Sequence, residues 1–127
     1  MLETLDAAAV RRWCAAGLAA LRRHEKEIND LNVYPVPDGD TGTNLVLTFA
    51  AAHRALREAG ERTGDHVGAV LQVMAQGALL GAQGNSGAIL AQVLRGFADT
   101  LAAAPAARGR YLADALTTAA KEGYAAV

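Results

Sequence analysis

Two aspartates, Asp38 and Asp40, stand two positions apart in a glycine-rich stretch and are the residues of this chain best suited to chemistry. A turn at this point lets both carboxylates converge. Mg²⁺ takes oxygen ligands, commonly one or two carboxylates together with phosphate oxygens and water. An EF-hand calcium loop is excluded, because its third oxygen ligand and its closing Glu would fall on Gly42 and Phe49. The spacing therefore predicts a magnesium site.

The alternative for this stretch is a turn that only caps the following helix, since Asp, Thr and Gly are all favoured in turns and caps. Two features favour a binding site. Pro35 and Pro37 stiffen the approach to the aspartates. Thr43 and Asn44 place polar groups at a helix N-terminus, where unpaired N–H groups and the helix dipole attract phosphate.

A second loop, from Gly81 to Gly87, repeats this logic between two apolar helices. Gly84 permits close backbone approach, and Asn85 and Ser86 supply donors at the start of the next helix. The loop is neither a P-loop nor a Rossmann fingerprint. Glycines that only allow close helix packing are the alternative for this loop alone. The two loops together suit an Mg²⁺-nucleotide polyphosphate.

The elements that must position these loops are helices, recognised from apolar residues at three- and four-residue steps. We expect helices at about 6–29 and 43–59, a third carrying Val67 to Leu79 and capped by Asp65, a fourth carrying Ile89 to Leu101, and a last one from about 110. The third is apolar nearly all round and is expected to be buried. No alternating strand pattern of useful length is present. The fold class is all-α, with about five helices in one domain, 1–127.

The expected core follows the apolar faces of these helices. In the first helix the face comprises Val10, Cys14, Gly17, Leu21 and Ile28, widened by Trp13 and Leu18, and in the second Val46, Phe49, Ala50, His53 and Leu56. His53 is expected to be a core or rim histidine rather than a ligand. Arg95 could reach phosphate, and a surface position is an equal alternative.

Composition narrows the class of protein. The chain has 127 residues, with 12 Lys+Arg against 13 Asp+Glu, which argues against a dedicated nucleic-acid binder. One cysteine excludes an internal disulfide and fits a reducing compartment. Val67 to Leu94 carries no charge but is interrupted by Gln, Asn, Ser and Gly, so no membrane span is expected. Acidic residues near the N-terminus are unlike an export signal. A cytoplasmic protein is expected.

The stretch Leu31-Asn32-Val33-Tyr34-Pro35-Val36-Pro37-Asp38-Gly39-Asp40-Thr41-Gly42-Thr43-Asn44, followed by Gly81-Ala82-Gln83-Gly84-Asn85-Ser86-Gly87, closely resembles the ATP-binding L-subunit family of dihydroxyacetone kinases. It looks closest to the branch at the N-terminus of the bacterial fatty-acid kinase ATP-binding subunit. The resemblance implies an antiparallel barrel of about eight amphipathic helices that binds Mg²⁺-ADP or ATP at one end. The family continues beyond position 127 into further helices, so this chain would be incomplete and, alone, inactive.

The resemblance also assigns roles to residues. Asp38 and Asp40 would be catalytic residues that ligate one or two Mg²⁺ ions. The residues that would contact the nucleotide phosphates are Thr41, Gly42, Thr43, Asn44, Gly84, Asn85 and Ser86. The dihydroxyacetone kinases carry a third aspartate shortly before the pair, and here Asn32 and Asp30 stand near that place. Asn32 is taken as the third metal ligand.

The function expected from loops and resemblance is the Mg²⁺-ATP-binding domain of a kinase. In the resembled branch the acceptor is a fatty-acid carboxylate presented by a separate lipid-binding protein. A carboxylate is already ionised at pH 7, which suits loops without a convincing general base. Phosphorylation of a hydroxyl, as in dihydroxyacetone kinase, is one alternative. A non-catalytic, oligomerising or regulatory helical module is another, because the third and fourth helices carry apolar surface in excess. A homo-oligomer is expected in either case.

Overall fold

The computed structural model describes residues 4–31, 39–60, 64, 66–101, 107–108 and 117–122. Within them are four long helices, α1 (Ala7–Leu31), α2 (Thr41–Ala59), α3 (Val67–Leu80) and α4 (Gly84–Leu101), and residues 117–122 are also helical. The prediction of an all-α fold with about five helices is confirmed. None of the described helices is both long enough and apolar enough to cross a membrane.

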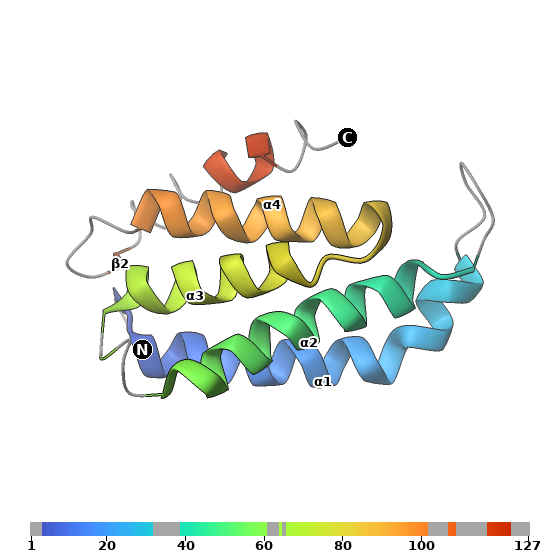
Figure 1. The fold of residues 1–127 in the computed structure, drawn as a ribbon, viewed down its shortest axis with the longest axis horizontal. Helices are drawn as coiled ribbons and strands as arrows, with labels where there is room; N and C mark the ends of the chain where they lie inside the picture. Colours follow the sequence, from blue (N-terminus) through green and yellow to red (C-terminus); the bar gives the residue numbers. More distant parts are fainter. Residues whose placement is uncertain are drawn as a thin grey trace.

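The long helices run alternately up and down, so each is antiparallel to the next (Figure 1). α1 packs on α2, α2 on α3 and α3 on α4, and α2 also contacts α4. Residues 117–122 lie on the outer side of α4, where Ala119 is buried and lies close to Gly96. α3 also contacts α1, so α2 and α3 each contact the other three long helices and form the middle of the bundle.

A short antiparallel ribbon pairs the segment before α1 with a segment that follows α4. Its strands, β1 (Thr4–Leu5) and β2 (Ala107–Arg108), have two residues each and pair Thr4 with Arg108 and Leu5 with Ala107. The sequence shows no strand because two residues are too few to produce an alternating pattern. The ribbon ties the segment before α1 to the segment after α4.

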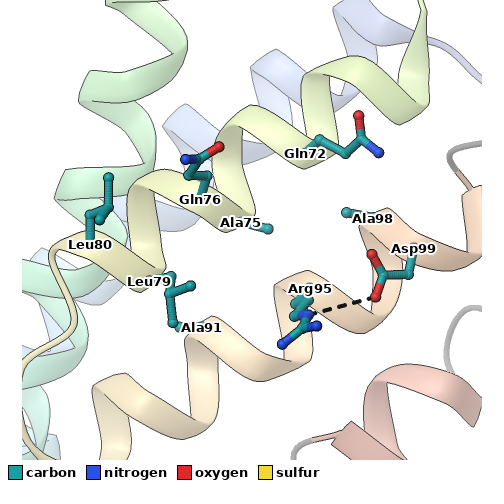
Figure 2. Close-up of a pocket in the computed structure, with 9 residues that line it drawn as sticks. All are labelled: Gln72, Ala75, Gln76, Leu79, Leu80, Ala91, Arg95, Ala98 and Asp99. Carbon is teal, nitrogen blue, oxygen red and sulfur yellow. Dashed lines mark ion pairs between the residues drawn. The ribbon is translucent and has the colours of Figure 1, made fainter.

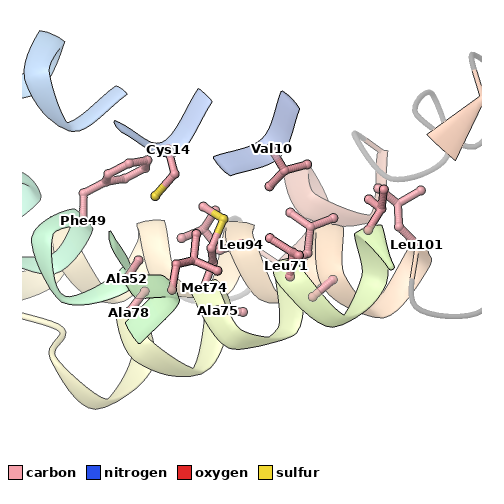
Figure 3. Packing of buried hydrophobic residues seen from close by; sticks show 14 of the residues in the cluster. Val10, Cys14, Phe49, Ala52, Leu71, Met74, Ala75, Ala78, Leu94 and Leu101 are labelled. Atoms are coloured by element: carbon pink, nitrogen blue, oxygen red, sulfur yellow. The ribbon is translucent and has the colours of Figure 1, made fainter. Parts of the chain in front are cut away.

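The core lies where α1, α2, α3 and α4 meet (Figure 3). Its largest fully buried side chains include Met74, Leu101, Val10 and Val70. α1 contributes Ala7, Val10, Cys14 and Leu18, a stripe that follows the 3.6-residue helical period. Cys14, Phe49 and Leu56 are buried as expected.

Two expectations about burial are wrong, and the burial of one further residue was not predicted. Trp13 is 53% exposed and touches the bundle edge-on at Phe49, with ring centroids 5.7 Å apart, because it lies beside the buried stripe and not on it. α3 is not buried all round, since Leu79 is 51% and Leu80 81% exposed at its C-terminal end. Thr48 was not expected in the core but is 0% exposed, because a hydrogen bond satisfies its hydroxyl.

The cap of α3 also differs from the expectation. The expected cap, Asp65, lies outside the described residues. His66 occupies the N-cap position, and its Nδ1 accepts a hydrogen bond of 3.2 Å from the Ala69 backbone N–H. A histidine nitrogen can therefore do here what a carboxylate oxygen does at most helix starts.

Candidate functional site

The start of α2 carries the first of the two predicted loops. Asp40 is exposed and occupies the N-cap position, and its backbone carbonyl accepts the Asn44 N–H at 2.9 Å. Its carboxylate makes no capping hydrogen bond to α2. The interpretation in which this aspartate serves only as a helix cap is therefore not what the geometry favours. Asp38 and Asn32, predicted as metal ligands, lie outside the described residues.

The cap of α2 is supplied by α1 instead. Asn29 Oδ1 accepts the backbone N–H of Thr43 at 3.1 Å, and Asn29 Nδ2 donates to Thr43 Oγ1 at 3.0 Å. The Thr43 hydroxyl in turn donates to Glu25 Oε2 at 2.8 Å. These three half-buried side chains, which we call the Glu25–Asn29–Thr43 network, bind the first turn of α2 to the last turns of α1.

Gly42 lets the two helices approach closely enough for this network to form. It is buried, and a Cβ at its position would collide with the Glu25 carbonyl oxygen and would lie 2.9 Å from Asn29 Oδ1 and 3.1 Å from Ile28 Cβ. These neighbours are largely backbone or packed helix and have little freedom to move. Gly42, predicted to contact phosphate, thus has a packing role that any side chain would disturb.

The second loop is anchored on α2 two turns further along. The Gln83 backbone N–H donates to Thr48 Oγ1 at 3.1 Å, and Gly87 lies so close that a Cβ there would collide with the same hydroxyl. Thr48 is fully buried. Thr48 therefore fixes the position along α2 at which the loop between α3 and α4 contacts this helix.

The predicted residues of the two loops meet at this point. Gly84 begins α4 with φ +66°, a conformation that L side chains rarely adopt, and a Cβ there would collide with the Asn44 side-chain amide. Ser86 Oγ donates to the Thr41 carbonyl oxygen at 3.4 Å, a long hydrogen bond. Residues about forty positions apart in sequence thus lie side by side, with Asn85 exposed next to them.

This arrangement brings two helix N-termini together. The first N–H groups of a helix have no acceptor within the helix and carry the positive end of its dipole. In α2 the Asn29 side chain satisfies the N–H of Thr43, so the groups before it and those at the start of α4 are the ones placed to receive an anion. Two adjacent starts can contact two phosphoryl groups at once.

The metal site rests on fewer described residues. Asp40 is the described carboxylate at the start of α2, and an exposed carboxylate beside two helix N-termini has the oxygen chemistry that Mg²⁺ prefers. In the part of the chain that the structure describes, no three His, Cys, Asp or Glu side chains cluster closely enough to hold a metal ion. The metal prediction thus depends on Asp38, whose placement is outside this description.

Arg95 lies away from both loops. Its side chain is exposed and pairs with Asp99 one turn later on α4, with 3.7 Å between Nε and Oδ2 (Figure 2). Of the two alternatives for Arg95, the surface position is the one observed.

Sequence reasoning missed Glu25, Asn29 and Thr48 as supports of the site. Glu25 and Asn29 are four residues apart and so lie on one helix face, but nothing in α1 alone shows that α2 begins opposite them. Thr48 lies seven residues after Thr41, on the same face of α2 as the loop residues. That spacing was a usable signal, although a polar residue inside a helix is more often solvent-exposed.

Among the described residues, fold and site together define an all-α domain in which the starts of α2 and α4 lie side by side, with Asp40 at the first of them. A family model described as the DAK2 domain matches residues 35–127, and the chain belongs to this family, which is associated with kinase subunits.

Relatives support the assignment. The chain is 39% identical over 100 residues to protein YloV of Bacillus subtilis, covering 79% of this chain and 18% of YloV. It is 32% identical over 127 residues to an uncharacterized protein of Staphylococcus saprophyticus, covering 100% of this chain and 22% of that protein. An uncharacterized protein of Staphylococcus aureus is 35% identical over 111 residues, with 87% and 20% covered. The chain thus spans about a fifth of the length of these relatives.

Proposed function

We propose that this chain is the Mg²⁺-nucleotide-binding domain of a phosphotransferase that acts in the cytoplasm. The observation that carries the proposal is the convergence of the two helix starts, where Ser86 contacts Thr41 and Gly84 packs on Asn44 beside an aspartate that does not cap its helix. Such a site holds a polyphosphate through backbone N–H groups and orients it.

The residues of this chain divide the work. The starts of α2 and α4 bind the phosphate oxygens, with Asn44, Asn85 and Ser86 as side-chain donors. Mg²⁺ held by Asp40 and Asp38, with Asn32 as a third ligand, would offset the negative charge of ATP during transfer. The Glu25–Asn29–Thr43 network holds the first turn of α2 against α1 and so fixes where that turn lies relative to the second loop.

The acceptor we propose is a fatty-acid carboxylate presented by a separate lipid-binding protein. Its oxygen forms a bond to the γ-phosphorus while the bond to the β,γ-bridging oxygen breaks, which yields an acyl phosphate and ADP. No proton has to be removed from the acceptor. A hydroxyl acceptor would need a base. Of the two described carboxylates near the start of α2, Glu25 already accepts the Thr43 hydroxyl, and Asp40 is assigned to the metal ion in this proposal. The carboxylate acceptor is therefore preferred.

Calorimetric titration with ATP and ADP, with and without Mg²⁺, tests nucleotide binding. We expect Mg²⁺-dependent binding that is lost in the double variant Asp38→Asn plus Asp40→Asn. Asp99→Asn is the matched control, since it removes one exposed carboxylate from α4 and leaves the loops untouched. Absence of nucleotide binding in the intact protein, or equal binding in the double variant, contradicts the proposal.

A second candidate function is a non-catalytic helical module that associates with itself. It is favoured by a groove of about 370 Å³ between α3 and α4, beside which Leu79 and Leu80 are exposed (Figure 2). Size-exclusion chromatography with and without Mg²⁺-ATP separates the candidates. An oligomer that ignores nucleotide favours the module.

A further inference from the structure

A second groove, of about 490 Å³, lies between α1 and α2. It is lined by Leu18 and Arg22 of α1 and by Ala50, His53, Arg54, Arg57 and Glu58 of α2. Arg54 follows Asn44 by ten residues, which is about 15 Å along a helix axis. This groove, which we call the arginine groove, is therefore separate from the two loops and shares only α2 with them.

The arginine groove concentrates positive charge, although the net charge of the chain is -1. The whole chain has 12 Lys+Arg against 13 Asp+Glu, yet three of the seven lining residues are arginines and only one, Glu58, is acidic. In the part of the chain that the structure describes, Arg22, Arg54 and Arg57 have no carboxylate within ion-pair distance. Other basic residues do form ion pairs. Lys26 of α1 pairs with Asp30 at 3.2 Å, and Arg95 of α4 pairs with Asp99 at 3.7 Å.

Both helices that form the groove contribute arginines to it. Arg22 comes from α1, and Arg54 and Arg57, three residues apart, come from one face of α2. The two apolar lining residues are less exposed than the arginines, since Leu18 is buried and Ala50 is half-buried. A ligand that fills the groove must match both charge and apolar surface.

Arg22, Arg54 and Arg57 are exposed, and this exposure determines which kind of anion they can bind firmly. A single ion pair with an exposed arginine contributes about 0 to 1 kcal/mol and is screened by salt. A small anion would meet one or two of these side chains and share them with water. An extended polypeptide with several carboxylates meets both walls together, and each guanidinium can bind a carboxylate with two parallel hydrogen bonds.

We infer that the arginine groove binds an acidic segment of a partner protein. Carboxylates of the segment pair with Arg22, Arg54 and Arg57, and one apolar side chain packs on Leu18 and Ala50. The inference does not depend on phosphoryl transfer, because no lining residue belongs to either loop.

Fluorescence anisotropy with a labelled eight-residue peptide of alternating Glu and Leu tests this inference. We expect saturable binding that weakens steeply with added salt, and no binding of the matching Lys and Leu peptide. The triple variant Arg22→Glu, Arg54→Glu and Arg57→Glu should weaken binding at least tenfold. The triple variant Arg22→Gln, Arg54→Gln and Arg57→Gln provides the same test with a smaller perturbation, and circular dichroism verifies that each variant is folded.

The matched control reverses the same number of charges elsewhere, at the exposed residues Arg12, Arg23 and Lys121. Its binding should stay within about twofold of the unaltered chain. If reversing the charges at Arg12, Arg23 and Lys121 weakened binding as much as reversing those of the arginine groove, the effect would be one of non-specific charge and the inference would be overturned. Failure of the acidic peptide to bind overturns it too, as does tighter binding of pyrophosphate or of a single-stranded oligonucleotide at the same groove.

Discussion

The sequence predicts that Thr43 lies at the start of a helix, which the structure shows, but it does not predict the hydrogen bonds that Thr43 makes with α1. Its position at the start of α2 made it a candidate phosphate contact, but its hydroxyl bonds Glu25 and Asn29, and its N–H bonds Asn29. A sequence reveals which groups a residue carries, whereas their partners here come from a different helix. The partners of Thr43 could therefore not be predicted from the spacing of residues within the loop.

Replacing Thr43 by Val tests the contribution of its hydroxyl, since the shape and the backbone N–H stay. Glu25 and Asn29 would each lose a hydrogen-bond partner in a half-buried place, and we expect a loss of about 1 to 3 kcal/mol in the free energy of unfolding. Urea denaturation measures it. Thr100→Val on α4 is the control and should change stability by less than about 0.5 kcal/mol. An equal effect of the two substitutions would mean that the network adds nothing.

Cys14 predicts a dependence of stability on alkaline pH. The thiol is 0% exposed, and burial raises its pKa from the ordinary value of 9.0 to about 11. Above pH 9 the thiol ionises more readily in the unfolded chain than in the folded one. The contribution of Cys14 to the free energy of unfolding is therefore fully present below pH 9 and declines as the pH rises towards 11. By pH 10 the loss is about 1 kcal/mol.

The readout for Cys14 is the difference between the unaltered chain and Cys14→Ala across pH 8 to 10.5. Other groups titrate in both proteins and cancel in that difference. Cys14→Ala should be less stable at pH 8, because it leaves a small cavity, and the gap should narrow as the pH rises. A gap that stays constant with pH would contradict a raised thiol pKa.

At the scale of the elements, small residues determine how closely α2 approaches its neighbours. Gly42 admits the backbone of α1, and Gly77 of α3 lies so close to α2 that a Cβ would be 2.6 Å from Ala55 Cβ and 3.0 Å from the Ala51 carbonyl oxygen. Side chains at these points would separate the helices. Since both loops are fastened to α2, helix spacing and site geometry are coupled.

Gly42→Ala should therefore destabilise the chain and weaken nucleotide binding together. We expect a cost of about 1 to 3 kcal/mol from overpacking, measured by urea denaturation, with a parallel loss of affinity for Mg²⁺-ADP. Gly17→Ala on α1 is the matched control, because its new Cβ would meet only the tip of the Phe49 ring, at 3.2 Å. If Gly17→Ala proved the more damaging of the two, the close approach of α1 and α2 would not be what positions the loop.

Helices were the predictable part of this fold, and their packing was not. Regular three- and four-residue spacing located α1 to α4 to within a few residues, because the core-facing stripe is a property of one helix at a time. The predictions for Trp13 and for the end of α3 are wrong and the burial of Thr48 was not predicted, because each depends on contacts with other elements of the fold. The candidate site was found through its glycines and polar residues, while the α1 side chains that support it were not.

At the scale of the whole molecule, the exposed end of α3 is the feature that the four-helix packing does not explain. Leu79 and Leu80 adjoin the groove that α3 forms with α4, and adjacent exposed leucines are unfavourable in water. When the 127 residues are studied alone, a second copy is the available cover.

We therefore expect the isolated 127-residue chain to self-associate with increasing concentration, as measured by sedimentation velocity. The double variant Leu79→Glu plus Leu80→Glu should shift it towards monomer, because charge repulsion replaces apolar burial, while its helical content by circular dichroism stays unchanged. Leu47→Glu is the matched control, an exposed leucine on α2 that is 49% exposed and does not line this groove. A chain that stays monomeric throughout, or that dissociates equally in the control, would show that the α3 leucines tolerate water and that the patch is no interface.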